Sequence, residues 1–390
     1  MLVCGERIRQ ARELLGLSQE ELAARVGVTQ EAISSYENGL FQPGEQALQA
    51  IALTTGFPPS FFMRPPVELP EGSLLFRKRT RAGRRAWMKA YRFAQLLLEM
   101  AFLLIPSVEG VTVRLPRLSG VDPEEAAAYT RSALGLSPGT PIRHLTRSLE
   151  RAGVLVFRLP PDPDIQDLDG FSMWAGEPRQ WPVIVVASGL PGDRLRFTLA
   201  HELGHLVLHM PHHVPPQEFE RAAHRFAGAL LLPAEAFVDG FPLLPTLATL
   251  LPLKARWGVS LQALLLRARD LHCLPEHRFR LLYQQLTSAG WRSSEPGEVP
   301  VEHPRMLSQM AELVYGKPVR TGELARDLRF PARLTAQLLE VQYGQDPGGR
   351  AQPGDVVPLL AGRRCGVDAC KEDHFPSNVG IRGHEAPPRE

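Results

Sequence analysis

The stretch RFTLAHELGHLVLH, residues 196–209, places two histidines four residues apart on one predicted helix. At about 100° per residue, His205 lies about 40° from His201 around the helix axis, and Glu202 lies about 100° from it. Leucines occupy the opposite side, which predicts that the helix packs against a core behind a polar face. That polar face favours a metal site, although an amphipathic helix with merely exposed histidines would give the same pattern.

Imidazole nitrogens spaced in this way suit Zn²⁺, and a third protein ligand leaves a fourth position for water. We therefore predict that His201 and His205 bind zinc. Glu202 is then the base that takes a proton from the water, while the metal lowers the pKa of that water and polarises a scissile carbonyl. The β-branched run WPVIVVA, residues 181–187, predicts a strand just before the helix.

A third ligand is expected on the next helix, QEFERAAHRFAGALLLP, residues 217–233. Glu220 is our prediction, because it shares one stripe with two alanines that would let this helix lie close to the first. Glu218 is the second choice, and either glutamate could instead be a solvated surface residue. His224 is expected either to stabilise a transition state or to lie at the surface. Three further histidines are predicted to lie at the rim: His209, His212 and His213.

These residues resemble the ImmA/IrrE family of metallopeptidases. The family pattern is a strand, then R-F-T-x-A-H-E-x-G-H-x-x-x-H, then E-x-x-A-x-x-F-A-x-x-L-L-x-P, and this chain fills it from Arg196 to Pro233. The upstream runs LERAGVLVF, DGFSMW and PVIVVA are similar to the family's leading strands, so the resemblance covers about residues 120–270. It implies a zincin-like fold, cleavage of a protein substrate, typically a repressor, and Zn²⁺ at His201, His205 and Glu220. The fold further implies that the edge of the WPVIVVA sheet holds an extended substrate by main-chain pairing.

Residues 5–62 predict five short helices separated by short turns. Ser18 and Thr29 are suited to cap the second and third helices, and Ser18 forms a capping box with Glu21. Gly27 stands in the turn between those helices, as a helix-turn-helix requires. The motif S-Q-x-x-L-A-x-x-x-G-V-x-x-x-x-I-S-x-x-E-N-G begins at Ser18 and resembles the XRE (phage-repressor-like) family of DNA-binding domains.

This second resemblance places the third helix in the major groove of double-stranded DNA, and such domains usually bind as dimers, which leaves a homodimer open. Base reading falls to Gln30, Glu31 and Ser35, and a phosphate contact to Gln19. Glutamine can pair with adenine and glutamate can accept from cytosine, so the chemistry fits. A small helical domain that binds only protein is the alternative. The predicted DNA-contacting residues are Gln19, Thr29, Gln30, Glu31, Ser34 and Ser35.

The charge of the predicted DNA-binding domain is unfavourable for DNA, because residues 1–70 hold five Arg and eight Glu, which gives a net charge of −3. Residues 71–95 carry a net charge of +7, since they hold eight Lys or Arg residues and one glutamate. We expect this basic helix either to supplement phosphate contact or to form a solvated linker face. Its basic residues are Arg77, Lys78, Arg79, Arg81, Arg84, Arg85, Lys89 and Arg92.

The whole composition, 44% hydrophobic and 22% charged over 390 residues, excludes wholesale disorder. A net charge of +2 gives no global field toward nucleic acid. Four scattered cysteines exclude a disulfide framework, and no apolar run approaches the roughly 20 residues that span a bilayer. We expect no membrane partner and a cytoplasmic location. Cys365, Cys370 and His374 lack a fourth ligand, so we predict no metal there.

The sequence thus predicts a multidomain chain: an all-α helix-turn-helix domain, an α+β zincin-like metallopeptidase domain and a helical C-terminal region. Its expected parts are a helix-turn-helix domain (1–65), a basic linker helix (66–105), the peptidase domain (106–290), the helical region (291–345) and a disordered tail (346–390).

We expect a DNA-binding transcriptional regulator whose gluzincin-like zinc peptidase domain cleaves a regulatory protein, either a partner repressor or the chain itself. Two alternatives stay open. One is a transcription factor whose metal domain only senses a metal or a ligand, and the other is an antitoxin-like partner protein. Glu202 favours catalysis, because metal sensing has no need of a base.

Overall fold

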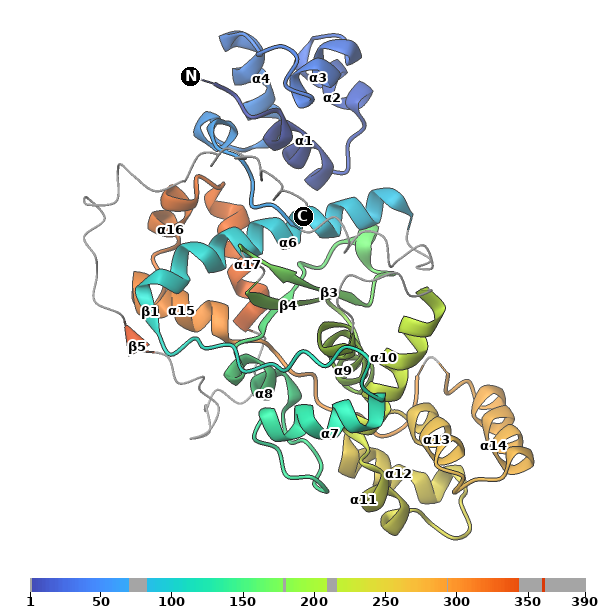
Figure 1. Cartoon of the computed structure of the whole chain (residues 1–390). Coiled ribbons are helices and arrows are strands. Elements are labelled where there is room, and N and C mark those ends of the chain that lie inside the picture. Colours follow the sequence, from blue (N-terminus) through green and yellow to red (C-terminus); the bar gives the residue numbers. More distant parts are fainter. Residues whose placement is uncertain are drawn as a thin grey trace, which may run out of the picture.

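The computed structural model describes residues 2–69, 83–177, 180–208, 216–292, 294–343 and 360–361. Figure 1 shows a cluster of N-terminal helices at one end, a small sheet in the middle and a further group of helices at the other end. Among the described residues, no helix combines the length and the apolar character that a bilayer span requires.

The N-terminal cluster consists of the five short helices that the sequence predicts. The capping box between Ser18 and Glu21 is present, and Thr29 caps the third helix through its hydroxyl. Gly27 adopts a φ of 78° in the turn between the second and third helices, a backbone conformation that favours glycine. The elements are α1 (Gly5–Leu14), α2 (Gln19–Val26), α3 (Gln30–Glu37), α4 (Glu45–Thr55) and the 3-10 helix η1 (Pro59–Met63).

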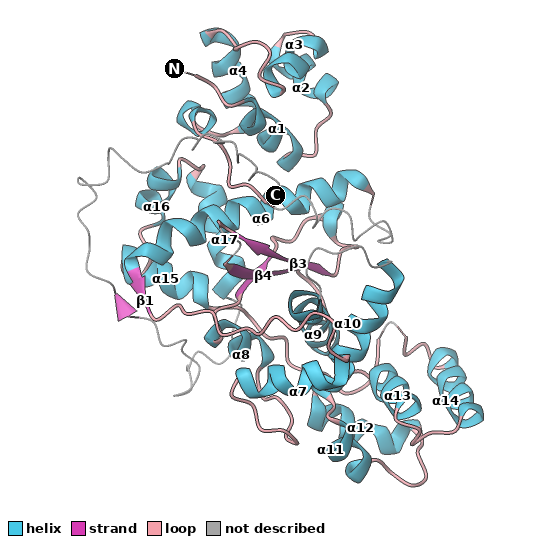
Figure 2. Ribbon diagram, viewed as in Figure 1, coloured by secondary structure: helices cyan, strands magenta, loops and turns pink. Residues whose placement is uncertain are grey.

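The central sheet has three strands in the order β2-β4-β3 (Figure 2). The run WPVIVVA forms β4 (Trp181–Val186), which pairs in parallel with β2 (Leu155–Arg158) and antiparallel with β3 (Gly170–Ala175). WPVIVVA is thus the middle strand, and the edges of its sheet are β2 and β3. The edge strand β3 packs against the helix that carries the two histidines of the metal motif.

The sheet separates two hydrophobic cores, and alternate residues of each strand enter opposite ones. Phe157 and Val185 belong to a core that includes the N-terminal helices and the C-terminal ones. Val156 and Ile184 belong to a second core, built with the helices that follow the sheet. The first core therefore joins the two ends of the described chain on one face of the sheet.

Helix α6 (Arg84–Leu104) lies between the N-terminal helices and the sheet (Figure 1). Helix α1 packs on it from one side, and the Trp87 ring meets Phe171 of β3 with centroids 4.7 Å apart on the other. Most of its side chains are buried, so this part of the predicted linker helix belongs to the folded core. Four other basic residues of the predicted helix lie outside the described residues: Arg77, Lys78, Arg79 and Arg81.

Lys89 and Arg92 of α6 are buried, contrary to both expectations for the basic helix, phosphate contact and a solvated linker face. Lys89 is 7% exposed and pairs with Asp162 and Asp164 at 2.6 and 2.8 Å. Arg92 is 3% exposed and pairs with Glu6 and Glu13 of α1. Their charges are compensated within the fold. Arg84 and Arg85, at the start of α6, remain exposed.

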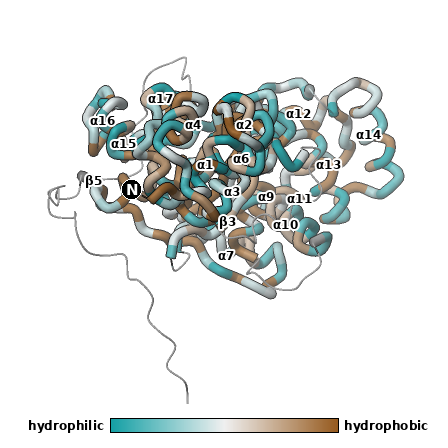
Figure 3. Tube along the Cα trace, turned by 90° about the horizontal axis from the view of Figure 1, so that it is seen from above, coloured by the Kyte–Doolittle hydropathy of each residue, from teal (hydrophilic) through white to brown (hydrophobic). Residues whose placement is uncertain are grey.

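The remaining helices form two groups, which lie at opposite ends when the molecule is seen from above (Figure 3). The predicted helices of the metal motif are α9 (Gly192–Leu208) and α10 (Pro216–Leu231). The first group also contains α7 (Pro123–Ala133), α8 (Leu145–Arg151), α11 (Ala234–Gly240), α12 (Leu247–Trp257), α13 (Leu261–Asp270) and α14 (Glu276–Ser288). The second group confirms the predicted C-terminal helices as α15 (Met306–Tyr315), α16 (Thr321–Leu328) and α17 (Ala332–Tyr343).

The remaining described elements are two short strands and two 3-10 helices. Strand β1 (Val108–Glu109) pairs antiparallel with β5 (Leu360–Ala361), the only described residues of the predicted tail. The 3-10 helices η2 (Ile105–Ser107) and η3 (Pro163–Ile165) follow α6 and β2. Cys365, Cys370 and His374 lie outside the described residues. The chain is thus a helix-turn-helix region followed by a mixed α+β region with a small sheet and by C-terminal helices.

Candidate metal centre

Close packing of α9 against α10 builds the centre. A Cβ on Gly204 would lie 3.0 Å from the Phe226 ring and 3.2 Å from the Ala223 Cα, tighter than ordinary contact. Glycine on α9 and alanine on α10 therefore let the two helix backbones approach closely, as the sequence suggested. This approach brings Glu220 of α10 over the two histidines of α9.

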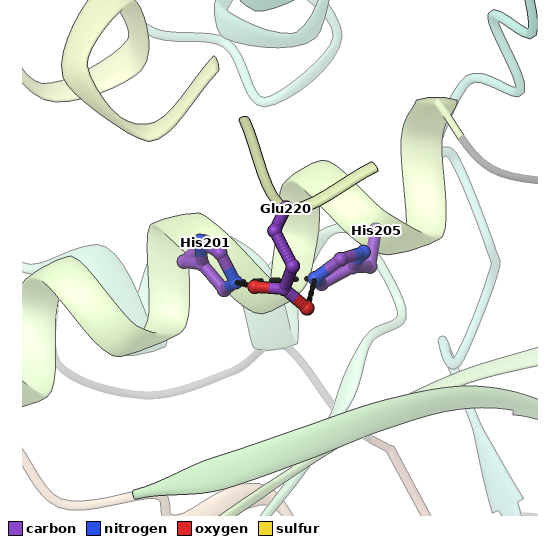
Figure 4. Close-up of side chains that lie close together, drawn as sticks. All are labelled: His201, His205 and Glu220. Carbon is purple, nitrogen blue, oxygen red and sulfur yellow. Dashed lines mark hydrogen bonds and ion pairs between the residues drawn. The ribbon is translucent and has the colours of Figure 1, made fainter. Parts of the chain in front are cut away.

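The side chains of His201, His205 and Glu220 converge (Figure 4). The two Nε2 atoms are 3.1 Å apart. Glu220 Oε2 lies 3.3 Å from His201 Nε2, and Glu220 Oε1 lies 3.6 Å from His205 Nε2. Glu218 is exposed and does not join them, so Glu220 is the carboxylate that the geometry selects. His209, His212 and His213 lie outside the described residues.

The spacing of the three side chains suits a metal ion such as zinc. Around a tetrahedral ion with bonds of 2.0–2.2 Å, neighbouring ligand atoms lie ~3.3–3.6 Å apart. The two distances from Glu220 match this range, and the 3.1 Å between the Nε2 atoms is slightly shorter. The donor set of two imidazoles and one carboxylate is also one that catalytic zinc sites use, with the fourth position left for water. His201 Nδ1 is buried and has no hydrogen-bond partner among the described residues, so ring packing rather than a described acceptor orients this imidazole.

Glu202 follows His201 on α9, and a hydrogen bond from the sheet holds its side chain. Its side chain is 3% exposed, and Ser172 of β3 donates its hydroxyl to Glu202 Oε2 at 2.8 Å. The same hydroxyl is 3.0 Å from the Glu202 carbonyl oxygen. The sequence reasoning missed Ser172, because only the strand register shows which residue of DGFSMW faces α9.

His224 borders the centre on the α10 side. Its ring centroid is 4.6 Å from that of His201 and 5.7 Å from that of Phe197. Desolvation and the nearby His201 ring lower the pKa of His224, so its imidazole is neutral at pH 7. The ring keeps part of its surface in solvent. His224 therefore lines the approach to the centre rather than joining the three converging side chains.

The motif's arginine anchors α9 instead of reaching the centre. Arg196 is buried, forms an ion pair with Glu302, and donates to the carbonyls of Ile142 and Gly258. Burial alone would raise the pKa of Glu302, but a hydrogen bond with His144 and the charge of Arg196 outweigh it and lower this pKa to about 2. A residue beyond the predicted peptidase domain thus fixes the start of the metal helix.

The predicted DNA-reading residues lie on the outer side of the N-terminal cluster. Gln30 and Glu31 of α3 are exposed, and the docked helix α1 lies between α3 and α6 (Figure 1). Gln30 Nε2 donates to Gln19 Oε1 at 3.1 Å, and Gln19 Nε2 donates to Glu37 at 2.8 Å. This chain of amides leaves both glutamines at the surface. The other predicted contacts, Thr29, Ser34 and Ser35, are exposed or half-buried.

Comparison with known sequence families agrees with both sites. Residues 8–62 match the helix-turn-helix family, and residues 149–269 match the IrrE N-terminal-like domain of the M78 peptidases. An uncharacterized HTH-type transcriptional regulator of Sinorhizobium medicae is 43% identical over 58 residues, 15% of this chain and 42% of that protein. An uncharacterized HTH-type transcriptional regulator of Methanothermobacter thermautotrophicus is 47% identical over 49 residues, 13% of this chain and 71% of that protein.

The chain thus spans less than half the length of the first of these relatives, and the likeness lies in the helix-turn-helix segment. Among solved structures, Bacillus thuringiensis PlcR in complex with the peptide PapR7 and DNA is 14% identical. That match covers 88% of this chain and 97% of PlcR, with a TM-score of 0.17, which is too low to indicate a shared fold.

Proposed function

Since the chain belongs to the HTH-type transcriptional regulators and carries an IrrE N-terminal-like peptidase domain, we propose that it couples DNA binding to zinc-dependent cleavage of a regulatory protein. The cleaved protein is a partner repressor or this chain itself. The observation that carries the proposal is the convergence of His201, His205 and Glu220, with Glu202 held beside them by Ser172.

His201, His205 and Glu220 would hold the zinc ion. When bound, Zn²⁺ supplies Lewis acidity that makes water a stronger acid and polarises a peptide carbonyl. Glu202 accepts the proton of the attacking water, and Ser172 keeps that carboxylate in one orientation by its hydrogen bond. Glu202 is 3% exposed, so the base is shielded from bulk solvent.

The outer edge of β3 is the strand edge next to α9, and it would hold the substrate in extended form. Main-chain pairing at a sheet edge gives affinity without fixing the substrate sequence. β3 also carries Ser172, so the strand that would align the substrate is the one that positions the base.

The N-terminal cluster would place the chain on DNA. Gln30, Glu31 and Ser35 are proposed to read base edges, with Gln19 at a phosphate and Thr29 and Ser34 beside them. Glutamine and glutamate have the donors and acceptors that base edges in the major groove require. Helix α1 lies between α3 and α6, so α3 faces away from the metal-site helices (Figure 1). We therefore expect the chain to hold DNA and substrate at the same time.

The test compares the cellular protein termini in strains that carry wild type or Glu202→Gln. We expect a new terminus of one regulatory protein with wild type alone, while both chains retain equal zinc. Equal termini and unchanged phenotypes, with zinc retained by the variant, would contradict the peptidase and leave the metal-sensing alternative. A matched Glu218→Gln strain should behave as wild type, because Glu218 is exposed and outside the centre.

A further inference from the structure

A cleft of about 1050 Å³ lies beside the metal centre, between α10 and α13 with the turn that leads to α14. Small-molecule pockets usually measure ~300–1,000 Å³, so this cleft is large enough for a stretch of peptide. Its lining includes Ala263, Leu266 and Leu274, which give it an apolar part, and Gly228, which adds no side chain.

Two residues of the cleft's lining lie close to the metal centre. Phe197, one turn before His201 on α9, and His224, one turn after Glu220 on α10, both line it. The His224 ring also contacts the His201 ring. A peptide whose scissile bond lies at the centre can therefore place a neighbouring side chain in the cleft.

The rim of the cleft carries more cations than anions. Its lining holds four arginines against the two carboxylates of Asp270 and Glu276. Arg267 is buried and paired with Glu124, and Arg269 is paired with Asp270. The positive charge available to a ligand therefore comes from the other two arginines of the rim, both on α10.

Those two arginines are exposed and weakly engaged. Arg225 lies 3.3 Å from Asp122, but both side chains are 52% exposed, so water screens the pair. Arg221 donates to the Gln217 carbonyl at 3.4 Å, a long hydrogen bond within its own helix. Each guanidinium can therefore turn toward a carboxylate in the cleft.

We propose that this cleft selects the substrate by binding an acidic side chain near the scissile bond, with Arg221 and Arg225 as its partners. The proposal rests on the peptidase function proposed above and names the class of its substrate. Acidic peptide, rather than nucleic acid, is favoured because the cleft adjoins the metal centre and is partly apolar.

The test measures binding without turnover, using the full-length, zinc-loaded Glu202→Gln chain. Two pools of fluorescein-labelled octapeptides have random flanks and differ only in a fixed central Glu or Gln. We expect the Glu pool to bind about fivefold more tightly, as a partly exposed ion pair allows. The same variant with Arg221→Gln and Arg225→Gln should lose this difference. Arg326→Gln, an exposed arginine on α16, is the matched control and should keep it.

Equal affinity of the two pools, or a difference that survives the double arginine change, would overturn the proposal. So would displacement of the Glu pool by a short single-stranded oligonucleotide that depends on the same two arginines, because this would assign the cleft to nucleic acid. Cleavage is assayed separately with the wild-type chain. A positive binding result with no cleaved protein in cells would therefore reject the peptidase and keep the acidic-peptide cleft.

Discussion

Ser172 donates its hydroxyl to the Glu202 carboxylate across 2.8 Å, so the central sheet holds the side chain that is proposed to act as the base. A hydrogen bond to a charged group contributes ~1.5–3 kcal/mol, and most of that would be lost without the hydroxyl. This hydrogen bond couples the sheet to the metal helix at the residue next to His201.

Replacing Ser172 with alanine should lower kcat by about tenfold. Losing the hydrogen bond that orients Glu202 should raise the activation free energy by ~1.4 kcal/mol, which corresponds to a tenfold slower reaction. KM and zinc content should not change, since Ser172 contacts neither the converging ligands nor the proposed acidic cleft. Ser188→Ala removes a hydroxyl that donates to the Leu159 carbonyl elsewhere at the sheet and serves as control. Loss of zinc from Ser172→Ala would contradict this positioning role.

Glu150 predicts a pH-dependent stability. It is buried and accepts from the backbone N–H groups of Arg305 and Met306, at the start of α15, at 2.9 and 2.8 Å. Burial raises its pKa from 4.5 to about 7. The folded chain therefore holds this proton more firmly than the unfolded chain does. The associated stability is full below pH 4.5 and is lost as the pH rises through 7.

Glu150→Gln removes the charge and keeps an acceptor for those N–H groups. At pH 8 it should raise the free energy of unfolding by on the order of 3 kcal/mol, and at pH 4.5 it should change it little. Urea unfolding at the two pH values measures the difference between wild type and variant. A difference that does not vary with pH would show that Glu150 does not titrate in this range.

The buried pair of Arg7 and Glu99 predicts how firmly the helix-turn-helix segment is docked on α6. Arg7 donates to both Glu99 oxygens at 2.7 and 2.8 Å, and both side chains are nearly inaccessible. Glu99→Gln leaves a buried guanidinium uncompensated, which should cost about 3–5 kcal/mol of unfolding free energy. Glu276→Gln breaks an exposed pair with Arg280 and should cost below about 0.5 kcal/mol. Equal costs in a denaturant series would refute the buried docking contact.

Gln30 predicts a base-specific contact. Gln30→Ala should weaken binding to a DNA site selected by the wild-type chain by about 1–3 kcal/mol, and should leave non-specific binding unchanged. Gln49→Ala, an exposed glutamine on α4, is the control. Fluorescence anisotropy at fixed salt gives both affinities. Equal losses on selected and random DNA would mean that Gln30 does not read a base.

Local patterns in the sequence predicted the parts that depend on local physics. The spacing of His201, Glu202 and His205 follows from helix geometry, and the caps at Ser18 and Thr29 involve residues three apart. Alanines on α10 correctly indicated the close approach that selects Glu220 over Glu218. These features need no knowledge of which distant segments meet.

Long-range contacts could not be predicted in this way. In the sequence, Lys89 and Arg92 resemble solvent-exposed basic residues, because their partners Asp162 and Glu13 are far away along the chain. Ser172 faces Glu202 only through the register of β3 on β4. Such side chains gain their roles from the packing of the sheet and not from their neighbours in the sequence.

Zinc analysis of the purified full-length chain tests the central claim most directly. X-ray absorption should show one zinc per chain with nitrogen and oxygen ligands at about 2.0–2.2 Å, and no sulfur. Glu220→Gln should weaken zinc binding by more than the ~10–100-fold that loss of an outer-shell partner costs, whereas Glu218→Gln should bind as wild type does. A chain that takes up no zinc, or one in which Glu218→Gln and Glu220→Gln bind it equally, would contradict the account.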